Sequence, residues 1–596
     1  MTDRRRLVTA LGLGAGLGFV GMPPLRAAET SDEEPWDVLV VGSGAAGLSA
    51  ALAADEAGAG RVAILEKMAI AGGHTLVASG SVNAYDPEGQ KRMGRTDSTE
   101  AFFRDTYEGG GRRGDPDLIS VLVHESEPML AWLKGHGVPF DPVLFEAYNG
   151  VFPRAHRTVM RRHGYVYVET LSRVAKRRGI PIFYRHRAQR LLLEEGAVAG
   201  VECQTPEGRK TFRARAVVLA TGGFGASAAL RMRWAPIFDE SFFTTYAAGS
   251  SHLDPATGDG IRMAEAVGAA LRDMDAVMAI PFWGGRVLDY PGAEIFLTLA
   301  GRRFTDETGT WRSVLDDLSR QGEKEFWVIT DGRSRKGATF ATKVQQGTVG
   351  TAQDLSELAI RMGIPANALR AEMEKYNRAA DLGRDEEFGR TRFTQRIETP
   401  PFYFGRERFD IHYTCGGVAI NAKAEVKNAE DLPIAGLYAA GEVTGGVHGN
   451  FRLGGNGLTD AFVFGRKAGQ SAAIRAKALK GSVKRAAAPR RERGPDKQDS
   501  KKSETEDFVE LLAKVGAQGF DFLAVVLREI GGHLVVGEAS EVLRAPEAGR
   551  VVVHDLVGVQ ITIPDGVRLA DAVAHVAAAL ADPAGVEDRV DGLVLE

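Results

Sequence analysis

The fold of this chain is decided by one stretch near its start, Trp36-Asp37-Val38-Leu39-Val40-Val41-Gly42-Ser43-Gly44-Ala45-Ala46-Gly47. Its apolar, β-branched residues predict a buried strand over 36–41, and its glycines predict a tight turn. An alanine-rich helix is expected next over 48–57, followed by a second strand over 61–65 that ends at Glu66. Strand, turn, helix and strand in this order are typical of the first βαβ unit of a Rossmann-type α/β domain.

The glycine spacing predicts a dinucleotide site. In Gly42-x-Gly44-x-x-Gly47 the glycines permit the turn, let the backbone approach a pyrophosphate and pack the strand on the helix. Glu66 follows Gly47 at the end of the next strand, where its carboxylate can accept a ribose hydroxyl. The alternative is a tight turn in an empty α/β sheet, which leaves the later glycine clusters unexplained.

Composition indicates a multidomain enzyme. A chain of 596 residues is too long for one core, and two to four folding units are expected. Glycine is enriched, at 72 residues or about 12%, while a net charge of -4 does not point to a nucleic-acid partner. Cys203 and Cys415 are the only cysteines, so no disulfide framework or c-type haem site is expected. Any electrons that the enzyme uses must then come from another protein, and no metal site is expected.

The first thirty residues predict an export signal. Arg4-Arg5-Arg6 precede an apolar run that extends to about Val20, and small residues follow at Ala27-Ala28. The adjacent arginines resemble a twin-arginine signal, so a periplasmic or otherwise exported protein is expected. The alternative is a basic N-terminus or an uncleaved anchor helix. No membrane span is expected beyond this signal.

The predicted fold class is α/β, with a discontinuous nucleotide-binding domain. Its expected parts are 36–245 and 406–475, with an inserted α+β capping domain over 246–405. A charged linker over 476–506 and a small C-terminal α+β module of unknown role over 507–596 follow. Helices are expected over 117–134, 165–178, 366–378, 458–472, 508–527 and 569–580, and strands over 216–220, 296–299, 437–440, 550–554 and 558–563.

Four further glycine-containing segments carry a family resemblance: Ala71–Thr75, Ala220–Gly225, Gly258–Gly260 and Gly441–Gly449. With the first motif, they make residues 36–475 similar to the fumarate reductase/succinate dehydrogenase flavoprotein superfamily. That superfamily includes soluble flavocytochrome-like and ketosteroid or tricarballylate dehydrogenase-like members. The resemblance implies FAD, a cap over the isoalloxazine ring, and hydride transfer between flavin N5 and a carbon next to a carboxylate or carbonyl.

The motifs and the resemblance together name the residues expected to bind FAD. They are Gly42, Ser43, Gly44, Ala45, Ala46, Gly47, Glu66, Lys67, Gly72, Gly73, His74, Thr75, Ser79, Gly80, Thr221, Gly222, Gly223, Asp259, Gly441, Glu442, Asn456, Gly457 and Leu458.

Three residues are expected to be catalytic. His412, in His412-Tyr413-Thr414-Cys415-Gly416-Gly417, matches the family histidine that holds a substrate carboxylate, and Arg452 matches the carboxylate-binding arginine. The alternatives are a packed histidine and a surface arginine. Arg312 follows Gly301–Glu307, which looks like the family segment that precedes an arginine acting as general acid or base, although it stands one position later than in fumarate reductases.

Two departures from the family pattern concern the substrate. Ile280-Pro281-Phe282-Trp283 stands where soluble fumarate reductases carry a substrate-holding His-Pro, and no Glu/Arg relay pair is found in 284–292. A larger or less charged substrate that stacks on Phe282 and Trp283 is expected, such as another enoate, an aryl-acrylate or a cyclic enone.

His74 lies where membrane-bound relatives bind flavin covalently. A histidyl link would raise the flavin potential and suit oxidation of a saturated substrate. The alternative is a non-covalent neighbour of the ring.

Three functions remain open. The first is an FAD-dependent enoate reductase of fumarate-reductase type, which acts on a CH–CH group and exchanges electrons with a separate electron-transfer protein or a quinone-linked donor or acceptor. The second is a dehydrogenase of a saturated acid or ketosteroid-like ketone, because one site catalyses both directions. The third is a flavin-binding subunit or scaffold without its own turnover.

Overall fold

The computed structural model describes residues 34–480, apart from 148–149, 160–162, 247–251, 289 and 338, together with three short strands beyond residue 480. The chain divides into two compact units, Met1–Lys484 and Arg485–Glu596. The predicted export signal, most of the predicted linker and the helices expected over 508–527 and 569–580 lie outside the described residues.

A six-stranded sheet forms the centre of the first unit, in the order β17-β18-β9-β1-β2-β5. Its strands are β1 (Val38–Val41), β2 (Val62–Leu65), β5 (Ile182–Phe183), β9 (Val217–Leu219), β17 (Glu425–Lys427) and β18 (Pro433–Ala439). Neighbouring strands are parallel except β17 and β18. The strand predicted over 36–41 is confirmed as the buried strand β1, which begins two residues later.

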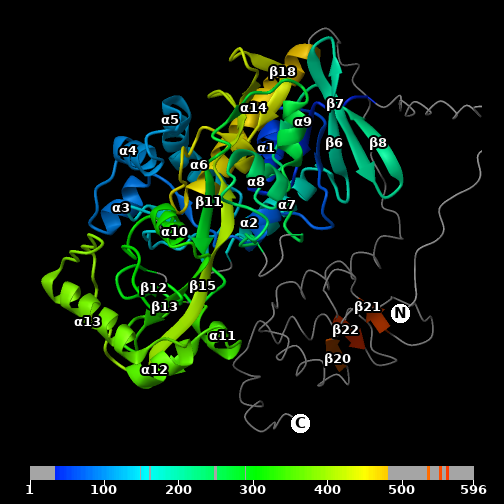
Figure 1. The fold of residues 1–596 in the computed structure, drawn as a ribbon. Helices are drawn as coiled ribbons and strands as arrows, with labels where there is room; N and C mark the ends of the chain where they lie inside the picture. Colours follow the sequence, from blue (N-terminus) through cyan, green and yellow to red (C-terminus); the bar gives the residue numbers. More distant parts are fainter. Residues whose placement is uncertain are drawn as a thin grey trace, which may run out of the picture. The chain divides into compact units, whose positions relative to one another are not determined.

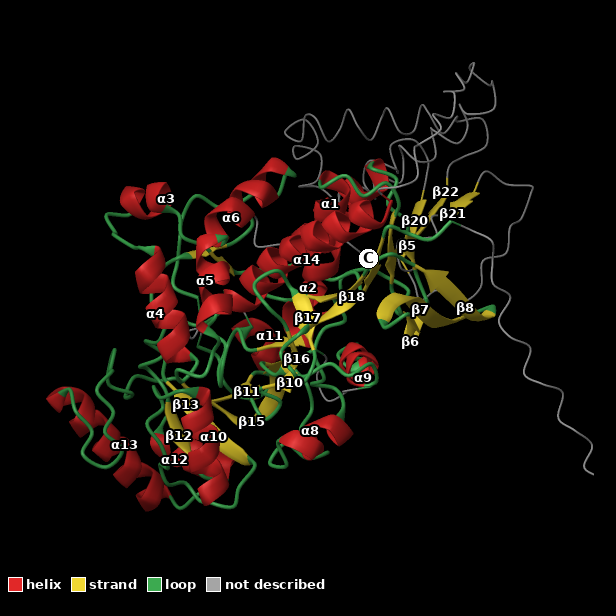
Figure 2. Cartoon of the chain, turned by 90° about the horizontal axis from the view of Figure 1, so that it is seen from above, coloured by secondary structure: helices red, strands yellow, loops and turns green. Residues whose placement is uncertain are grey.

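Helices α1 (Ala45–Glu56) and α14 (Asn456–Lys480) pack against this sheet, and α7 (Tyr165–Arg177) packs against α1. Segments far apart in sequence lie together in this sheet and its helices. In Figures 1 and 2, α14 runs beside α1, and β18 belongs to the same sheet as β1. The helix expected over 458–472 is longer at both ends, and its C-terminal turn takes in the first five residues of the predicted linker.

A helical segment follows the first βαβ unit. It contains α2 (Gly73–Val77), α3 (Pro87–Arg92), α4 (Thr99–Gly109), α5 (Pro116–His124) and α6 (Ser126–Gly135), with the short strands β3 (Val82–Asn83) and β4 (Ala155–His156). The single helix expected over 117–134 is therefore wrong, because the chain breaks at Glu125. Pro128 explains the break: proline is tolerated in the first turn of a helix but not in its interior.

Smaller elements surround the sheet. Strands β6 (Arg187–Glu194), β7 (Ala197–Thr205) and β8 (Gly208–Arg213) form an antiparallel sheet, and β10 (Leu271–Arg272), β16 (Gly417–Ala419) and β19 (Thr444–Gly445) form another sheet. Helices α8 (Ala228–Trp234) and α9 (Asp259–Glu265), and a 3-10 helix over Gly441–Val443, complete this part.

Residues 277–414, called the cap segment below, build a separate antiparallel sheet. It contains β11 (Val277–Pro281), β12 (Ile295–Leu297), β13 (Glu325–Thr330), β14 (Gly350–Ala352) and the long β15 (Phe402–Thr414). Its helices are α10 (Trp311–Arg320), α11 (Phe340–Gln345), α12 (Leu355–Met362) and α13 (Ala366–Leu382). The domain boundary expected at 405 falls inside β15, which runs the length of this sheet in Figure 1.

The described part of the second unit is a three-stranded antiparallel sheet of β20 (His533–Val536), β21 (Arg550–Val552) and β22 (Val559–Thr562). Strands β21 and β22 lie within the segments predicted over 550–554 and 558–563, whereas β20 was not predicted.

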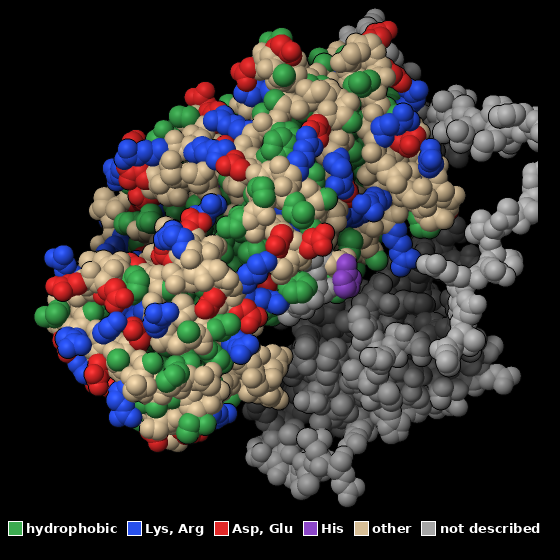
Figure 3. Space-filling model, viewed as in Figure 1, with side chains coloured by type: hydrophobic (Ala, Val, Ile, Leu, Met, Phe, Trp, Pro, Cys, Tyr) green, Lys and Arg blue, Asp and Glu red, His purple; other side chains and the backbone are tan. Residues whose placement is uncertain are grey.

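Basic and acidic side chains are interspersed over the face of the molecule shown in Figure 3. Within the described ranges, no helix has both the length and the hydropathy needed to cross a bilayer.

Candidate active site

A cavity of about 770 Å³ runs from the end of β1 into the cap segment. One side of it is lined by the glycine loop, residues 72–81, the end of β9 and the start of α14. The other side is lined by Met278, Ile280–Trp283, Arg286–Leu288, Trp311, Gly337, Thr339, Lys343, His412 and Tyr413. The nucleotide-binding motifs and the cap residues therefore share one cavity.

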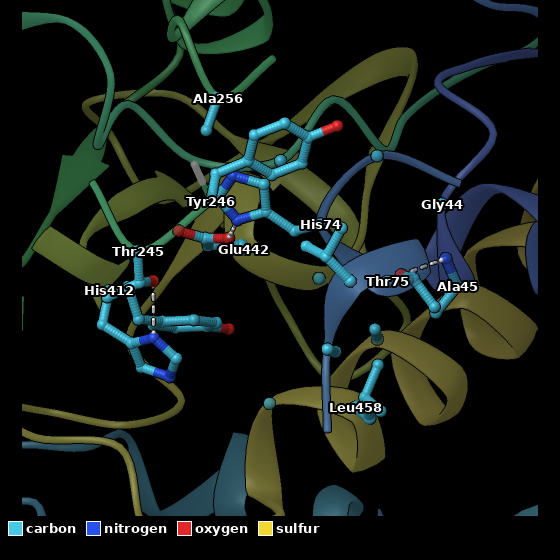
Figure 4. Close-up of a pocket in the computed structure, with 18 of the residues that line it drawn as sticks. Gly44, Ala45, His74, Thr75, Thr245, Tyr246, Ala256, His412, Glu442 and Leu458 are labelled. Carbon is cyan, nitrogen blue, oxygen red and sulfur yellow. Dashed lines mark hydrogen bonds and ion pairs between the residues drawn. The ribbon is translucent and has the colours of Figure 1, made fainter. Parts of the chain in front are cut away.

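The glycine loop has the geometry of a pyrophosphate site. The N-cap residue Gly44 has no side chain to cap α1, so N–H groups of the first turn beyond Ala45 can bind an anion. Thr75 Oγ1 accepts a hydrogen bond from Ala45 N at 3.0 Å and ties α2 to this turn (Figure 4). A Cβ at Gly47 would lie 1.9 Å from the carbonyl oxygen of Gly42, so this position requires glycine.

Glu66 lies at the end of β2, as the dinucleotide motif predicts. Its carboxylate is buried, lines the cavity, and accepts hydrogen bonds from Ser43 N at 3.0 Å and Ser43 Oγ at 2.5 Å. The acid therefore fixes the glycine loop and is placed to reach a ribose.

Lys67 and Asp259 close the same side of the cavity. Lys67 Nζ donates to Pro255 O at 2.6 Å and Thr257 Oγ1 at 2.8 Å, and lies 3.1 Å from Asp259 Oδ2. Burial raises the pKa of Asp259, but Lys67 and Arg187 outweigh it and lower that pKa to about 2. The ionised carboxylate holds the start of α9 against the end of β2.

Most residues expected to bind FAD line the cavity. Three do not. Gly47 packs against Gly42, Gly223 packs beside Thr414 and Glu442, and the buried Asn456 accepts a hydrogen bond from Asn83 Nδ2 at 2.7 Å. Their positions support the loops that form the wall. The cavity size, the α1 terminus and Glu66 together fit a dinucleotide such as FAD.

His74 lies between two carboxylates. Its Nε2 is 2.6 Å from Asp254 Oδ1, its Nδ1 is 3.6 Å from Glu442 Oε2, and its ring stacks on Tyr246 at 5.3 Å (Figure 4). Burial lowers the pKa of His74, but Asp254 and Glu442 outweigh burial and raise that pKa to about 10. His74 is therefore an imidazolium at neutral pH.

His412 lies on β15 (Phe402–Thr414) and, unlike His74, is uncharged. Thr245 Oγ1 is 2.9 Å from its Nδ1, which leaves Nε2 for a ligand (Figure 4). Burial, with the positive charges of Arg452 and His74, lowers the pKa of His412 to about 3. The imidazole is neutral and can exchange one hydrogen bond with a substrate.

Arg452 supplies a buried cation to the cavity. Only 8% of the residue is exposed, Nη1 donates to Leu453 O at 3.0 Å, and the guanidinium carbon lies 4.8 Å from the centre of the Tyr413 ring. Among the residues that the structure describes, no carboxylate oxygen lies within 4.0 Å of Arg452. A buried guanidinium without an acidic partner is suited to bind an anionic ligand.

The structure does not bring Arg312 to the cavity. Its side chain is 52% exposed, and its Nε lies 3.0 Å from Asp316 Oδ1 one turn further along α10. Trp311 is buried instead and lines the cavity. Consecutive helical residues point about 100° apart, so the one-position offset from the family pattern turns Arg312 outward. Arg312 therefore does not line the cavity, and its catalytic role stays a prediction from the sequence.

Two basic residues of the cap wall were not predicted from sequence, Arg286 and Lys343. Arg286 Nε and Nη2 both lie 2.9 Å from Glu294 Oε1, and both side chains are buried. This buried Arg286–Glu294 ion pair has its acid two residues beyond the 284–292 window, so the prediction that no Glu/Arg relay pair lies within that window stands as a prediction. No sequence signal marks Lys343, because only the cap fold brings α11 to the cavity.

The aromatic wall is where the sequence predicts it. Phe282 and Trp283 both line the cavity, and their rings meet edge to face at 5.0 Å. Such a wall suits a planar or apolar substrate body.

Comparison with known proteins identifies the family. Residues 37–458 match the model of the FAD binding domain family. Over 457 residues the chain is 35% identical to fumarate reductase (cytochrome) of Shewanella frigidimarina, which covers 75% of this chain and 78% of that protein. It is 32% identical to urocanate reductase of Eggerthella lenta over 463 residues, with 73% of this chain and 74% of that protein covered.

Coverage of another relative is less complete. The chain is 34% identical to NADH:fumarate oxidoreductase of Klebsiella pneumoniae over 453 residues, which cover 74% of this chain but span only about half of that protein, 48%. The fold matches the open conformation of a flavocytochrome c3 fumarate reductase with a TM-score of 0.62 and 31% identity, over 74% of this chain and 79% of that structure. The family resemblance stated from the motifs is confirmed. The chain belongs to the FAD binding domain family and, within it, to the FAD-dependent enoate reductases that act on CH–CH groups.

Proposed function

We propose that this protein reduces the carbon–carbon double bond of an enoate larger than fumarate. One observation carries the proposal: Arg452, a buried guanidinium with no carboxylate within 4.0 Å among the described residues, shares the cavity of the dinucleotide loop with the neutral His412. A guanidinium beside a neutral imidazole is suited to one carboxylate.

The side chains of this cavity divide the work of binding and polarisation. Arg452 binds the substrate carboxylate, and His412 donates one hydrogen bond to it from Nε2. Both interactions strengthen as negative charge grows on the carboxylate side of the double bond. FAD held by the glycine loop and Glu66 would supply the hydride for the carbon of the double bond that is distal to the carboxylate.

The proton for the other carbon comes, we propose, from Arg286 rather than Arg312. The Arg286 guanidinium carbon lies 5.1 Å from the centre of the Trp311 ring, so it reaches the wall that the 301–312 segment builds. Its partner Glu294 is buried, and burial raises the pKa of that carboxyl, which suits a group that carries protons. Arg286 becomes neutral when it gives up its proton, and after each turnover a proton from solvent would return to it through Glu294.

Substrate size follows from the aromatic wall. The relatives include a fumarate reductase and a urocanate reductase, whose named substrates are a dicarboxylate and an enoate with a heteroaromatic ring. Ile280–Trp283 replaces the His-Pro expected of a fumarate enzyme and contributes two aromatic rings to the cavity. An aryl-acrylate fits this wall better than fumarate.

Covalent attachment of FAD through His74 is a further proposal. Asp254 occupies Nε2, so Nδ1 is the ring nitrogen that can form the bond. Acid precipitation followed by flavin fluorescence tests the link. A yellow, fluorescent pellet is expected, whereas a colourless pellet would leave His74 as a non-covalent neighbour.

Dehydrogenation of a saturated acid or ketone is the second candidate function. The charge on His74 favours it, because an imidazolium in the flavin cavity stabilises electron-rich, reduced flavin and so raises its potential. For both reaction directions we also propose export through a twin-arginine signal. In both, the protein would exchange electrons with a separate protein or a quinone-linked partner.

A dye-coupled assay tests these functions. Holoprotein with reduced viologen is offered fumarate, acrylate and cinnamate, and holoprotein with an oxidising dye is offered the saturated acids. We expect reduction of cinnamate to dominate, and Arg452→Met to lower kcat/KM by about 100-fold or more with Arg452→Lys in between. Turnover in neither direction with any compound would favour the scaffold function.

A further inference from the structure

Lys343 places an ammonium group in the cap wall of the cavity. It lies on α11, is 6% exposed, and its Nζ donates to Phe282 O and Arg286 O, both at 2.8 Å. A lysine ammonium has three N–H donors, and these two bonds use two of them. The third donor is left for a group in the cavity.

The acids near Lys343 are engaged elsewhere. Glu407 accepts hydrogen bonds from the backbone N–H groups of Gly284 at 2.8 Å, Arg286 at 3.0 Å and Arg408 at 3.1 Å. Asp410 Oδ1 lies 3.3 Å from Arg408 Nε. Within the described part of the chain, no carboxylate oxygen comes within 4.0 Å of Lys343 Nζ.

Lys336 shows what a purely structural lysine looks like in the same segment. Its Nζ donates to Asp331 O at 2.7 Å, Ser334 O at 2.6 Å and Ser334 Oγ at 2.8 Å, so all three donors are used, and it does not line the cavity. Lys343 differs because one of its three donors is left over and because its side chain lines the cavity.

The surroundings of Lys343 suit the far end of an aromatic ligand. The carbonyl of Phe282 ties the ammonium to the loop that carries the aromatic wall. Trp283 Nε1 is buried, has no hydrogen-bond partner among the described residues, and belongs to a side chain that lines the cavity. A buried donor without a partner is unfavourable, and a ligand acceptor would satisfy it.

We propose that the cap wall is a second anion subsite, in which Lys343 binds a carboxylate or other anionic group at the ring end of an aryl-enoate. The substrate class is then an aryl-acrylate that carries a second negative charge opposite its enoate. This inference rests on the proposed function, which puts the enoate carboxylate at Arg452 and the ring against Phe282 and Trp283.

Two substrates that differ only in the distal charge test the subsite. We compare kcat/KM for 4-carboxycinnamate and cinnamate in viologen-coupled reduction by the holoprotein. The wild type is expected to prefer 4-carboxycinnamate by about tenfold or more, since charge-assisted hydrogen bonds contribute that much. Lys343→Met should bring the ratio close to about one and Lys343→Arg should restore part of it.

The matched control is Lys336→Met, which should leave the ratio unchanged. A Lys343→Met protein that loses equal activity on both substrates, or keeps the wild-type ratio, would overturn the subsite and leave Lys343 a structural clamp. A wild-type protein that does not prefer 4-carboxycinnamate to cinnamate would also overturn the subsite.

A binding measurement separates this subsite from the proposed reaction. The saturated analogues 3-(4-carboxyphenyl)propionate and 3-phenylpropionate are titrated into oxidised holoprotein, and the flavin absorbance change gives each Kd. If no enoate is reduced, the proposed function fails, yet a Kd ratio that favours the dicarboxylate and disappears in Lys343→Met still supports the subsite. A Kd ratio near one in the wild type would overturn the subsite.

Discussion

Two histidines of one cavity have different protonation states because of their immediate neighbours. His74 faces Asp254 and Glu442, which raise its pKa to about 10, while His412 is buried with Arg452 and His74 nearby, and its pKa falls to about 3. Neither value can be inferred from residue type, since an unperturbed histidine titrates near 6.5. The pair gives the cavity one fixed cation and one neutral hydrogen-bonding group.

The shift of His74 predicts a pH-dependent stability. Its folded pKa of about 10 exceeds the unfolded value of 6.5, so its stabilisation is complete below pH 6.5 and is lost as pH rises through 10. His74→Gln should therefore lower the stability of the apoprotein, in which His74 carries no flavin, by on the order of 2 kcal/mol at pH 7 and much less at pH 10.5. Thermal midpoints by circular dichroism at both pH values measure this, and an equal loss at both would contradict it.

Assigning the proton transfer to Arg286 instead of Arg312 predicts different outcomes for variants of the two arginines. Arg312→Gln removes an exposed pair with Asp316 and should change kcat/KM less than about twofold. Arg286→Gln removes the proposed proton donor and should lower kcat by about 100-fold or more.

Flavin content of both proteins provides the control for folding. A solvent isotope effect on kcat that grows in Arg286→Lys would support proton transfer, whereas a purely structural role would leave it unchanged. Large loss in Arg312→Gln would restore the original assignment.

Among the elements, the α1–α14 pair joins the first and last parts of the central sheet through small residues. A Cβ added at Gly469 of α14 would lie 2.1 Å from the carbonyl oxygen of Ala50 in α1. Both helices begin at the cavity, where Ala45 and Ala46 open α1, and Gly457 and Leu458 follow the first residue of α14. Their close approach therefore also sets the width of the nucleotide site.

Gly469→Ala should consequently separate the two helices. We expect a loss of about 2–3 kcal/mol in stability, as for other overpacked contacts, together with weaker flavin retention. Gly135→Ala in α6 is the matched control, because an added Cβ there meets nothing within 4 Å. Similar thermal midpoints for the two variants would rule out this account of the helix contact.

Local elements follow from local sequence, whereas the cap sheet does not. The run over 36–41 predicts β1 because burial on both faces needs continuous apolar residues. β11 pairs with β15, and Ile280 lies opposite Asp410 across more than a hundred residues. No periodicity in either strand specifies that register, since pairing depends on the rest of the fold.

At the scale of the whole molecule, the cavity needs only part of the chain. All its lining residues lie between Val41 and Ala461, within the first compact unit. The second unit contributes none of them among the described residues.

Removal of residues 507–596 should accordingly preserve the chemistry. We expect the shortened holoprotein to keep its FAD and at least about half of the viologen-coupled activity, because the cavity and both helices that open on it remain. Flavin absorbance per protein and the dye-coupled rate measure this. Loss of folding or flavin would show that the C-terminal module does more than interact with a partner.

The sequence by itself determined the nucleotide site and the family of this protein. Glycine spacing, an acid at the end of the second strand and ordered motifs depend on neighbours in the chain, so Gly42–Gly47, Glu66, His412 and Arg452 are all placed on the cavity or its supporting turn. The cap wall was decided only by tertiary structure. Helix phase turned Arg312 outward and Trp311 inward, and nonlocal packing brought Arg286 and Lys343 to the cavity. A basic side chain can contact a substrate only if the fold orients it into the cavity, and a linear motif does not contain that orientation.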